Sequence, residues 1–244
     1  MKTIGVLGGL GPQATMDFVA RLHAASQLLI PQPSGNSGYP PLAVYYHRNP
    51  PVLLGDDSMP LMPLQPDPQM LEGVKWLGQT ADFLVITANV PHMMADLIEE
   101  AAGIPLLNMV ELTLAEIARR SWHHIGALAL GEPKVYSGPL SEQGQKVEEI
   151  GSPLRDLLDQ AILRLMAGHT SNEETAVALE AVEELRSRGV DGIILGCTEI
   201  PLLLGETANA ADLINPAQLL ADAAVRLAAN NDLMPALVDA DTPR

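Results

Sequence analysis

Cys197 is the only cysteine in the chain, and its position makes it a candidate acid, base or nucleophile. It follows the apolar run Val190–Leu195 and precedes Thr198–Leu204, a pattern that predicts a strand, a turn at the cysteine and a short helix. A free cysteine in a core acts as a small hydrophobic residue. A thiol between a strand end and a helix start can instead face a ligand, and this position favours a functional role.

A second stretch, Asp82–His92, resembles the one around Cys197 and has Ala88 in place of the cysteine. Three pairs of segments align without gaps and in the same order: Ile4–Pro12 with Ile125–Pro133, Phe83–His92 with Gly192–Pro201, and Leu106–Asn108 with Leu213–Asn215. The shared Asn and Pro residues are not generic strand residues. We therefore predict an internal duplication.

Apolar periodicity predicts strands that alternate with helices. The expected strands are Lys2–Gly8, Leu42–His47, Asp82–Thr87, Ile104–Leu107, His124–Leu130, Val190–Leu195 and Leu213–Ile214. The expected helices are Gln13–Ile30, Gln69–Gln79, Asn89–Ala101, Met109–Ser121, Ser141–Ile150, Leu154–Ala167, Asn172–Arg188, Thr198–Leu204 and Pro216–Ala229. The proline-rich segment Asn49–Pro68 is expected to be a long loop that forms a lid or part of a site.

We predict an α/β protein of two pseudo-symmetric Rossmann-like lobes, each a mainly parallel sheet flanked by helices, because the strands are apolar throughout. The N-terminal lobe is expected to span residues 1–121 and the C-terminal lobe 122–230, with 231–244 as a tail. The last helix is the element that can pack on the first lobe instead. Ligands of such sheets collect at the carboxyl ends of the strands. The active site is therefore expected in a cleft between the lobes, with Ala88 and Cys197 on opposite walls.

Charge and composition argue against several classes of function. A net charge of −16 leaves no basic patch for nucleic acid or for an anionic membrane. A single cysteine excludes an intrachain disulfide and fits a reducing cytoplasm, and the six histidines lack metal-ligand spacing. We expect a cytoplasmic homodimer with a small-molecule substrate, no metal, and neither nucleic acid nor membrane as a partner.

The glycines at positions 8, 9 and 11 follow the first expected strand and open the first expected helix. Their spacing is not Gly-x-Gly-x-x-Gly, and no acidic residue ends the second strand in the manner of a dinucleotide site. A backbone cradle for a carboxylate is the preferred interpretation.

The motifs Ile4–Thr15, Asn89–His92 and Gly196–Glu199 resemble those of the aspartate/glutamate racemase family, which also includes hydantoin racemases, maleate isomerase and arylmalonate decarboxylase. The resemblance covers almost the whole chain. In that family two cysteines flank the substrate α-carbon without a cofactor, and one removes the proton while the other returns one to the opposite face. The resemblance implies Cys197 as an acid/base, and the start of the helix after it is expected to favour its thiolate. Further residues it implies are the substrate contacts Leu10, Gly11, Arg48, Asn89, Val90 and Thr198 and the auxiliary groups His92, Glu132 and Glu199.

Ala88 stands where the family has its first cysteine, so one acid/base is missing. Glu132 replaces a neutral residue of a threonine-rich loop, and Met166 stands where the aspartate-racemase branch has a lysine. The leading hypothesis is a PLP-independent racemase-like isomerase for aspartate, glutamate or a related carboxylic acid, impaired or one-directional because of Ala88. The alternatives are a one-cysteine decarboxylase or isomerase of the same superfamily, a catalytically silent protein that binds small acids, and an alanine introduced to trap a substrate.

Overall fold

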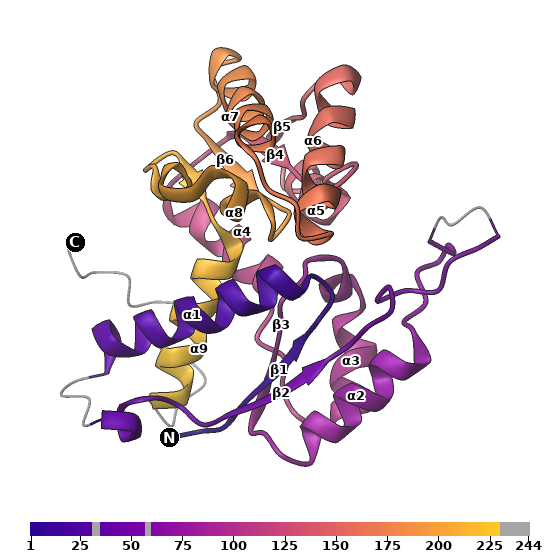
Figure 1. The fold of residues 1–244 in the computed structure, drawn as a ribbon, viewed down its shortest axis with the longest axis vertical. Helices are drawn as coiled ribbons and strands as arrows, with labels where there is room; N and C mark the ends of the chain where they lie inside the picture. Colours follow the sequence, from indigo (N-terminus) through magenta and orange to yellow (C-terminus); the bar gives the residue numbers. More distant parts are fainter. Residues whose placement is uncertain (31–34, 57–59, 230–244) are drawn as a thin grey trace. The chain divides into compact units, whose positions relative to one another are not determined.

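The computed structural model describes residues 1–30, 35–56 and 60–229 (Figure 1). Its strands are β1 Ile4–Gly8, β2 Leu42–Tyr46, β3 Phe83–Ile86, β4 His124–Leu128, β5 Lys146–Glu148, β6 Gly192–Leu195 and β7 Leu213–Ile214. Its α-helices are α1 Pro12–Leu29, α2 Pro68–Gly78, α3 Ala95–Ala102, α4 Met109–Arg119, α5 Lys134–Glu142, α6 Ser152–Met166, α7 Asn172–Ser187, α8 Ile200–Leu204 and α9 Pro216–Ala229. Three short 3-10 helices are η1 Gly35–Gly38, η2 Val90–Met94 and η3 Gly205–Asn209. The predicted tail, 231–244, lies outside the described residues.

The chain divides into two compact units. The first unit comprises Met1–Leu112 together with the part of α9 that starts at Ala217, and the second is Thr113–Pro216. The expected boundary at residue 121 therefore moves into α4, and the last helix belongs to the first unit rather than to the second. The reason is the apolar face of α9, where Leu220, Ala224 and neighbouring residues pack in one cluster with residues of α1 and β1.

The first unit is a parallel sheet of order β2-β1-β3 with helices on both faces. Successive residues of a strand point to opposite faces. Accordingly Ile4 and Val6 of β1 pack in the cluster with α1 and α9, whereas Leu7 packs in the cluster with α2 and α3. Figure 1 shows these two pairs of helices on opposite sides of the sheet. Burial on both faces explains why the strands read as continuous apolar runs.

The second unit is a parallel sheet of order β5-β4-β6-β7. The residues Ile193 and Leu195 of β6 share a core with α6, α7 and α8. Helix α7 begins with a capping box. The side chain of each of Ser171 and Glu174 accepts a hydrogen bond from the backbone N–H of the other.

The strand orders of the two units correspond in the way the internal duplication predicts. In the first unit Leu84 of β3 bridges Leu106, so residues around Leu106 extend the order to β2-β1-β3-Leu106. In the alignment of the two halves, β1 corresponds to β4, β3 corresponds to β6, and Leu106 corresponds to Leu213 of β7. Position 88, just after β3, is therefore equivalent to position 197, just after β6.

One expected helix, Ser141–Ile150, is wrong. The structure has α5 at Lys134–Glu142 and the strand β5 at Lys146–Glu148. Gly144, with φ of +77°, adopts the left-handed conformation that ends a helix, and the chain then turns into the edge strand. The expected helix Asn89–Ala101 is split into η2 and α3.

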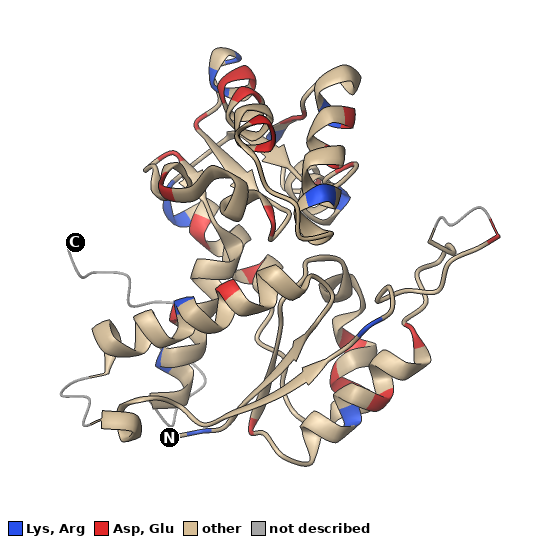
Figure 2. Cartoon of the chain, in the orientation of Figure 1, with Lys and Arg blue, Asp and Glu red and all other residues tan. Residues whose placement is uncertain are grey.

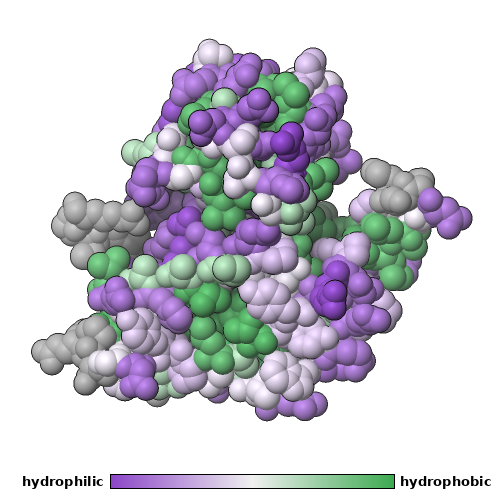
Figure 3. All heavy atoms as spheres, in the orientation of Figure 1, coloured by the Kyte–Doolittle hydropathy of each residue, from purple (hydrophilic) through white to green (hydrophobic). Residues whose placement is uncertain are grey.

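The segment Asn49–Pro68 is expected to be a long loop. In the structure, part of it pairs with itself in antiparallel fashion and forms an arm. Val52 bridges Pro66 and Leu54 bridges Pro60, with Leu53 N–H donating to Gln65 O at 2.9 Å. Leu54, Leu61 and Met62 are exposed, and Figure 3 shows hydrophobic side chains gathered on this arm. Within the described residues, no helix is both long enough and apolar enough to cross a bilayer.

Candidate active site

The carboxyl ends of the three strands in the first unit bring most of the expected substrate contacts together. His47 N–H donates to Gly8 O at 2.8 Å, and Thr87 N–H donates to Leu7 O at 3.1 Å, so β2, β1 and β3 end side by side. The residues that follow these ends are Arg48 after β2, the loop with Leu10 and Gly11 after β1, and Ala88, Asn89 and Val90 after β3. One sheet edge therefore carries all of them.

Two buried threonines hold the loop between β1 and α1. The hydroxyl of Thr15 accepts a hydrogen bond from Gly9 N–H at 2.9 Å and donates one to Gly11 O at 3.0 Å. Its own hydrogen is thereby used, so Thr87 Oγ1, 2.9 Å away, is the donor to Thr15 Oγ1. Sequence reasoning missed the role of Thr15, although this residue lies in the quoted motif. The network fixes the loop beside Ala88.

Several backbone N–H groups at the carboxyl ends of these strands have no acceptor in the described part of the protein. Across the described residues, the N–H groups of Leu10, Gly11 and Val90 form no hydrogen bond to a protein acceptor. Gly11 also precedes the first turn of α1, an 18-residue helix whose N-terminus favours negative charge. Free N–H groups at such a helix start suit a carboxylate.

Arg48 is exposed and forms no ion pair within the part of the chain that the structure describes. Acidic residues outnumber basic ones in this chain (Figure 2), and many basic side chains form ion pairs with them. Arg186, for example, bonds both carboxylate oxygens of Asp212 at 2.7 and 2.8 Å. A guanidinium at the strand ends that has no ion pair with any described residue is a cation available to an anionic ligand.

Gly9 allows the close approach of the loop to β2. Its φ is +82°, and a Cβ at this position would lie 2.4 Å from His47 O. We predict that Gly9→Ala lowers the free energy of unfolding by about 2–5 kcal/mol, since the left-handed φ costs roughly 1–2 kcal/mol and overpacking adds about 1–3 kcal/mol. Urea denaturation measures the loss. Gly103→Ala is the matched control, because Gly103 has φ of +69° and open space around its Cβ position. Equal losses in the two variants would contradict the clash.

His92 is buried in η2 with a neutral imidazole. Its Nε2 lies 3.4 Å from Ile86 O, which accepts the ring hydrogen, and no described residue is a partner for Nδ1. Burial lowers the pKa of His92 from 6.5 to about 4, and the bond to Ile86 opposes this shift. The ring is therefore an uncharged hydrogen-bonding group near neutral pH.

The low pKa of His92 predicts a loss of stability in acid. Between pH 6.5 and 4 the unfolded chain binds a proton at this residue and the folded chain does not, so the free energy of unfolding falls as the pH drops, by about 3 kcal/mol in total. Urea denaturation across this window, wild type against His92→Gln, measures the difference. The substitution of exposed His169 by Gln should leave the slope of wild type unchanged. Equal slopes for wild type and His92→Gln would contradict the buried neutral ring.

The second unit places Cys197, Thr198 and Glu199 in one hydrogen-bonded group after β6. Glu199 Oε2 accepts from Cys197 Sγ and from Thr198 Oγ1, each at 3.1 Å. Thr198 and Glu199 are buried, and Cys197 is partly exposed. Burial, and next the Glu199 carboxylate, raise the pKa of the Cys197 thiol well above its usual range.

The expectation that a helix start favours the Cys197 thiolate is wrong. Helix α8 has five residues and begins only at Ile200, so its dipole is small and distant. The adjacent Glu199 carboxylate disfavours a second negative charge. Cys197 is consequently a protonated thiol at rest, with its S–H directed at a carboxylate.

Glu132 is exposed and pairs with Lys134 at 2.8 Å. It follows β4, the strand next to β6, while the adjacent Gly131 N–H donates to Asp159 Oδ1 at 2.8 Å. The structure therefore gives Glu132 a local partner. A single cleft that serves both groups of strand ends stays a prediction.

Comparisons with known proteins agree with this architecture. The Asp/Glu/Hydantoin racemase family model matches residues 7–224. The broad specificity amino-acid racemase RacX of Bacillus subtilis (strain 168) is 26% identical over 236 residues, which cover 91% of this chain and 96% of the relative.

Two solved structures share the fold. An aspartate racemase homologue from Pyrococcus horikoshii OT3 has a TM-score of 0.71 at 23% identity and covers 94% of this chain and 100% of its own. Picrophilus torridus aspartate racemase has a TM-score of 0.68 at 21% identity and covers 94% of each chain. These matches confirm the predicted α/β class of two parallel sheets flanked by helices. Because the family model spans most of the sequence, this chain belongs to the Asp/Glu/hydantoin racemase family.

Proposed function

We propose that this chain is a cofactor-independent enzyme that moves a proton at the carbon α to a carboxylate, with Cys197 as its acid/base. The observation that carries the proposal is the thiol of Cys197 at the end of β6, bonded to Glu199 at 3.1 Å, in the position equivalent to Ala88. The name of the Bacillus relative supports an amino acid as the substrate.

The proposed step needs one thiol on one face of the substrate. The Cys197 thiolate, formed when the thiol loses its proton to solvent, removes the α-proton, and the electron pair stays on the α-carbon and its carboxylate. N–H groups stabilise this dianion where charge develops. We propose Leu10, Gly11, Val90 and Thr198 as backbone donors, with Arg48 and Asn89 binding the carboxylate by their side chains. His92 and Glu199 are the proposed auxiliary groups. His92 lies in η2, close after β3, and Glu199 accepts a hydrogen bond from the thiol.

The absence of a thiol at position 88 determines the expected stereochemical outcome. Cys197 returns a proton to the face from which it took one, so the enantiomer is retained. Since a thiol exchanges its hydrogen with solvent, the returned atom in D₂O is deuterium. Exchange with retention, rather than racemisation, is the expected reaction of the wild-type chain.

The test is incubation with L- and D-aspartate, L- and D-glutamate and a panel of other amino acids in D₂O, with the α-proton followed by NMR. Loss of the α-proton signal from one enantiomer, with chiral chromatography showing retention, supports the proposal. Binding without exchange across the panel would instead indicate a silent acid-binding protein. Sedimentation velocity tests the homodimer that is part of the proposal, and cell fractionation tests its cytoplasmic location.

A second candidate function is decarboxylation of a substituted malonate, favoured by the resting thiol of Cys197. Here the carbon–carbon bond to one carboxylate breaks, CO₂ leaves, and the electron pair remains on the α-carbon. Cys197 then gives its proton to that carbon and regains one from water. This step needs a proton donor and no base, which suits a thiol with a raised pKa. Release of CO₂ from methylmalonate and phenylmalonate distinguishes this function from exchange of amino acids.

A further inference from the structure

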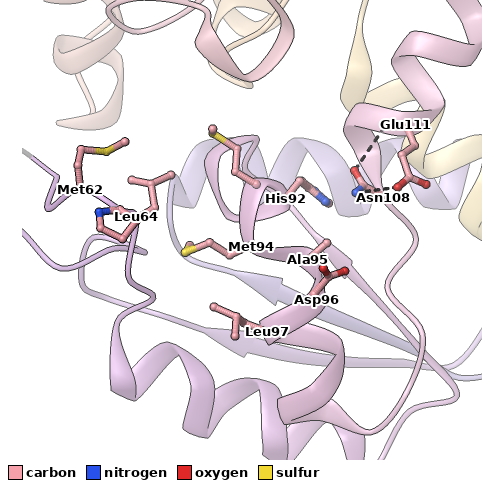
Figure 4. A pocket seen from close by; sticks show the side chains of 11 residues that line it. Met62, Leu64, His92, Met94, Ala95, Asp96, Leu97, Asn108 and Glu111 are labelled. Carbon is pink, nitrogen blue, oxygen red and sulfur yellow. Dashed lines mark hydrogen bonds between the residues drawn. The ribbon is translucent and has the colours of Figure 1, made fainter. Parts of the chain in front are cut away.

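The first unit contains a pocket of about 550 Å³ that lies beside η2 and α3. Its walls come from the arm after β2, from η2 and α3, and from the start of α4 (Figure 4). Of the residues proposed for the reaction, only His92 lines it. Its size is in the range of sites that hold small organic ligands.

The lining has one apolar part and one acidic part. Met62, Leu64, Met94 and Leu97 form the apolar part, and the polar side chains Asp96, Asn108 and Glu111 lie on the other side (Figure 4). Among the described residues, no lysine or arginine lines the pocket. Asp96 and Glu111 both lie in first helical turns, where a carboxylate also stabilises its helix. The acids alone therefore do not define a site.

The second observation is the unused acceptor of His92. The ring is 5% exposed, and Figure 4 shows it directed toward Asn108 at the polar part of the pocket. Since Nε2 carries the hydrogen that Ile86 O accepts, Nδ1 presents a lone pair, and it has no partner among the described residues. A buried acceptor without a donor is unfavourable, so the polar part lacks a hydrogen-bond donor.

The neighbouring amide does not supply that donor. Asn108 Oδ1 accepts from Val110 N–H at 2.9 Å and thereby caps α4. Asn108 Nδ2 is directed to Glu111 Oε1 at 3.4 Å, a long and weak bond that a ligand can replace. A molecule bound in the pocket can supply this donor.

We propose that this pocket binds a small organic cation in which a primary ammonium is attached to a compact apolar group. An ammonium has three donors and no acceptor, which matches the carboxylates of Asp96 and Glu111 and the free Nδ1 of His92. The apolar group packs on Met62, Met94 and Leu97, and methionine adapts its shape to varied ligands. This site shares His92 with the proposed reaction, but binding of an amine there does not require that reaction.

The experiment is isothermal titration calorimetry of the intact chain with 2-phenylethylamine, 2-phenylethanol and phenylacetate. These three probes share a phenyl group and differ in the charge of the polar end. We expect 2-phenylethylamine to bind about tenfold or more tightly than the alcohol, since its charged hydrogen bonds are the stronger ones, and phenylacetate to bind least. Equal binding of the three probes, or no binding of the amine, overturns the proposal.

Paired variants locate the site. Glu111→Gln should weaken the amine about threefold to fivefold, as expected for one partly exposed charge pair, while Glu173→Gln, also an exposed acid in a first helical turn, should have no effect. Leu97→Asn should weaken the amine, whereas Leu163→Asn, an exposed leucine of α6, should not. Full affinity in Glu111→Gln and Leu97→Asn overturns the assignment.

A direct readout of His92 completes the test. The ¹⁵N signal of its Nδ1 should move when the amine is added, and that of exposed His169 should not. A static His92 signal overturns its role as acceptor. Amine affinity that falls as protein concentration rises would show that a second copy of the chain covers the pocket, which also overturns the proposal.

Discussion

The Ala88→Cys variant is expected to racemise its substrate about 10²- to 10⁴-fold faster than the wild-type chain, the range that a positioned acid/base contributes. Racemisation requires a proton donor and acceptor on both faces of the α-carbon. Cys197 supplies one thiol, and the strand orders of the two sheets make position 88 the equivalent of position 197. The side chain at 88 is small and half-buried, so one added sulfur fits without disturbing a packed core. Chiral chromatography of samples taken over time measures the racemisation rate.

Two further variants separate the thiol's acid/base role from its bulk. Ala88→Ser adds a group of similar size that does not ionise near neutral pH, and it should leave the racemisation rate at the wild-type level. The double variant Ala88→Cys/Cys197→Ala should exchange the α-proton of the enantiomer opposite to that exchanged by the wild type. Equal racemisation by Ala88→Cys and Ala88→Ser would contradict the duplicated acid/base site.

The duplication was visible in the sequence because the strand ends repeat side-chain types that a generic strand does not need. Pro12 aligns with Pro133 and Asn108 aligns with Asn215, and the segments around them recur in the same order. Apolar strands and amphipathic helices follow from local periodicity, so the α/β class was predicted correctly. The same periodicity failed at Ser141–Ile150, because the turn at Gly144 and the edge strand β5 depend on pairing with β4.

The chemistry of the site depends on tertiary contacts that no sequence pattern predicts. Thr15 and Thr87 are distant in sequence and meet because the first turn of α1 lies beside the residue that follows β3. The state of Cys197 likewise follows from burial and from the direction of the Glu199 side chain, whereas the sequence suggested a helix dipole. The pocket beside His92 combines the arm, η2, α3 and α4, four segments with no shared motif.

Replacing Cys197 by alanine is expected to lower α-proton exchange by about 10²- to 10⁴-fold, because the proposed step has no second acid/base. Cys197→Ser should be equally inactive, since its hydroxyl keeps its hydrogen near neutral pH. The NMR exchange assay in D₂O measures both. Near-UV circular dichroism from the aromatic side chains, which include the fully buried Tyr136 of the same unit, shows whether the fold is retained. Exchange at the wild-type rate in either variant would assign the reaction to another residue.

The pH dependence of α-proton exchange tests whether Cys197 is the acid/base and Glu199 only raises its pKa. Exchange requires the thiolate, so its rate in the wild-type chain should rise with pH, about tenfold per unit while the pH is below the pKa of Cys197. Burial and the Glu199 carboxylate both raise that pKa. Glu199→Gln removes the charge but leaves the burial, so the pKa of Cys197 falls part of the way and the rise in rate shifts to lower pH. If Glu199 were itself the base, this variant would lose exchange at every pH, and that result would refute Cys197 as the acid/base.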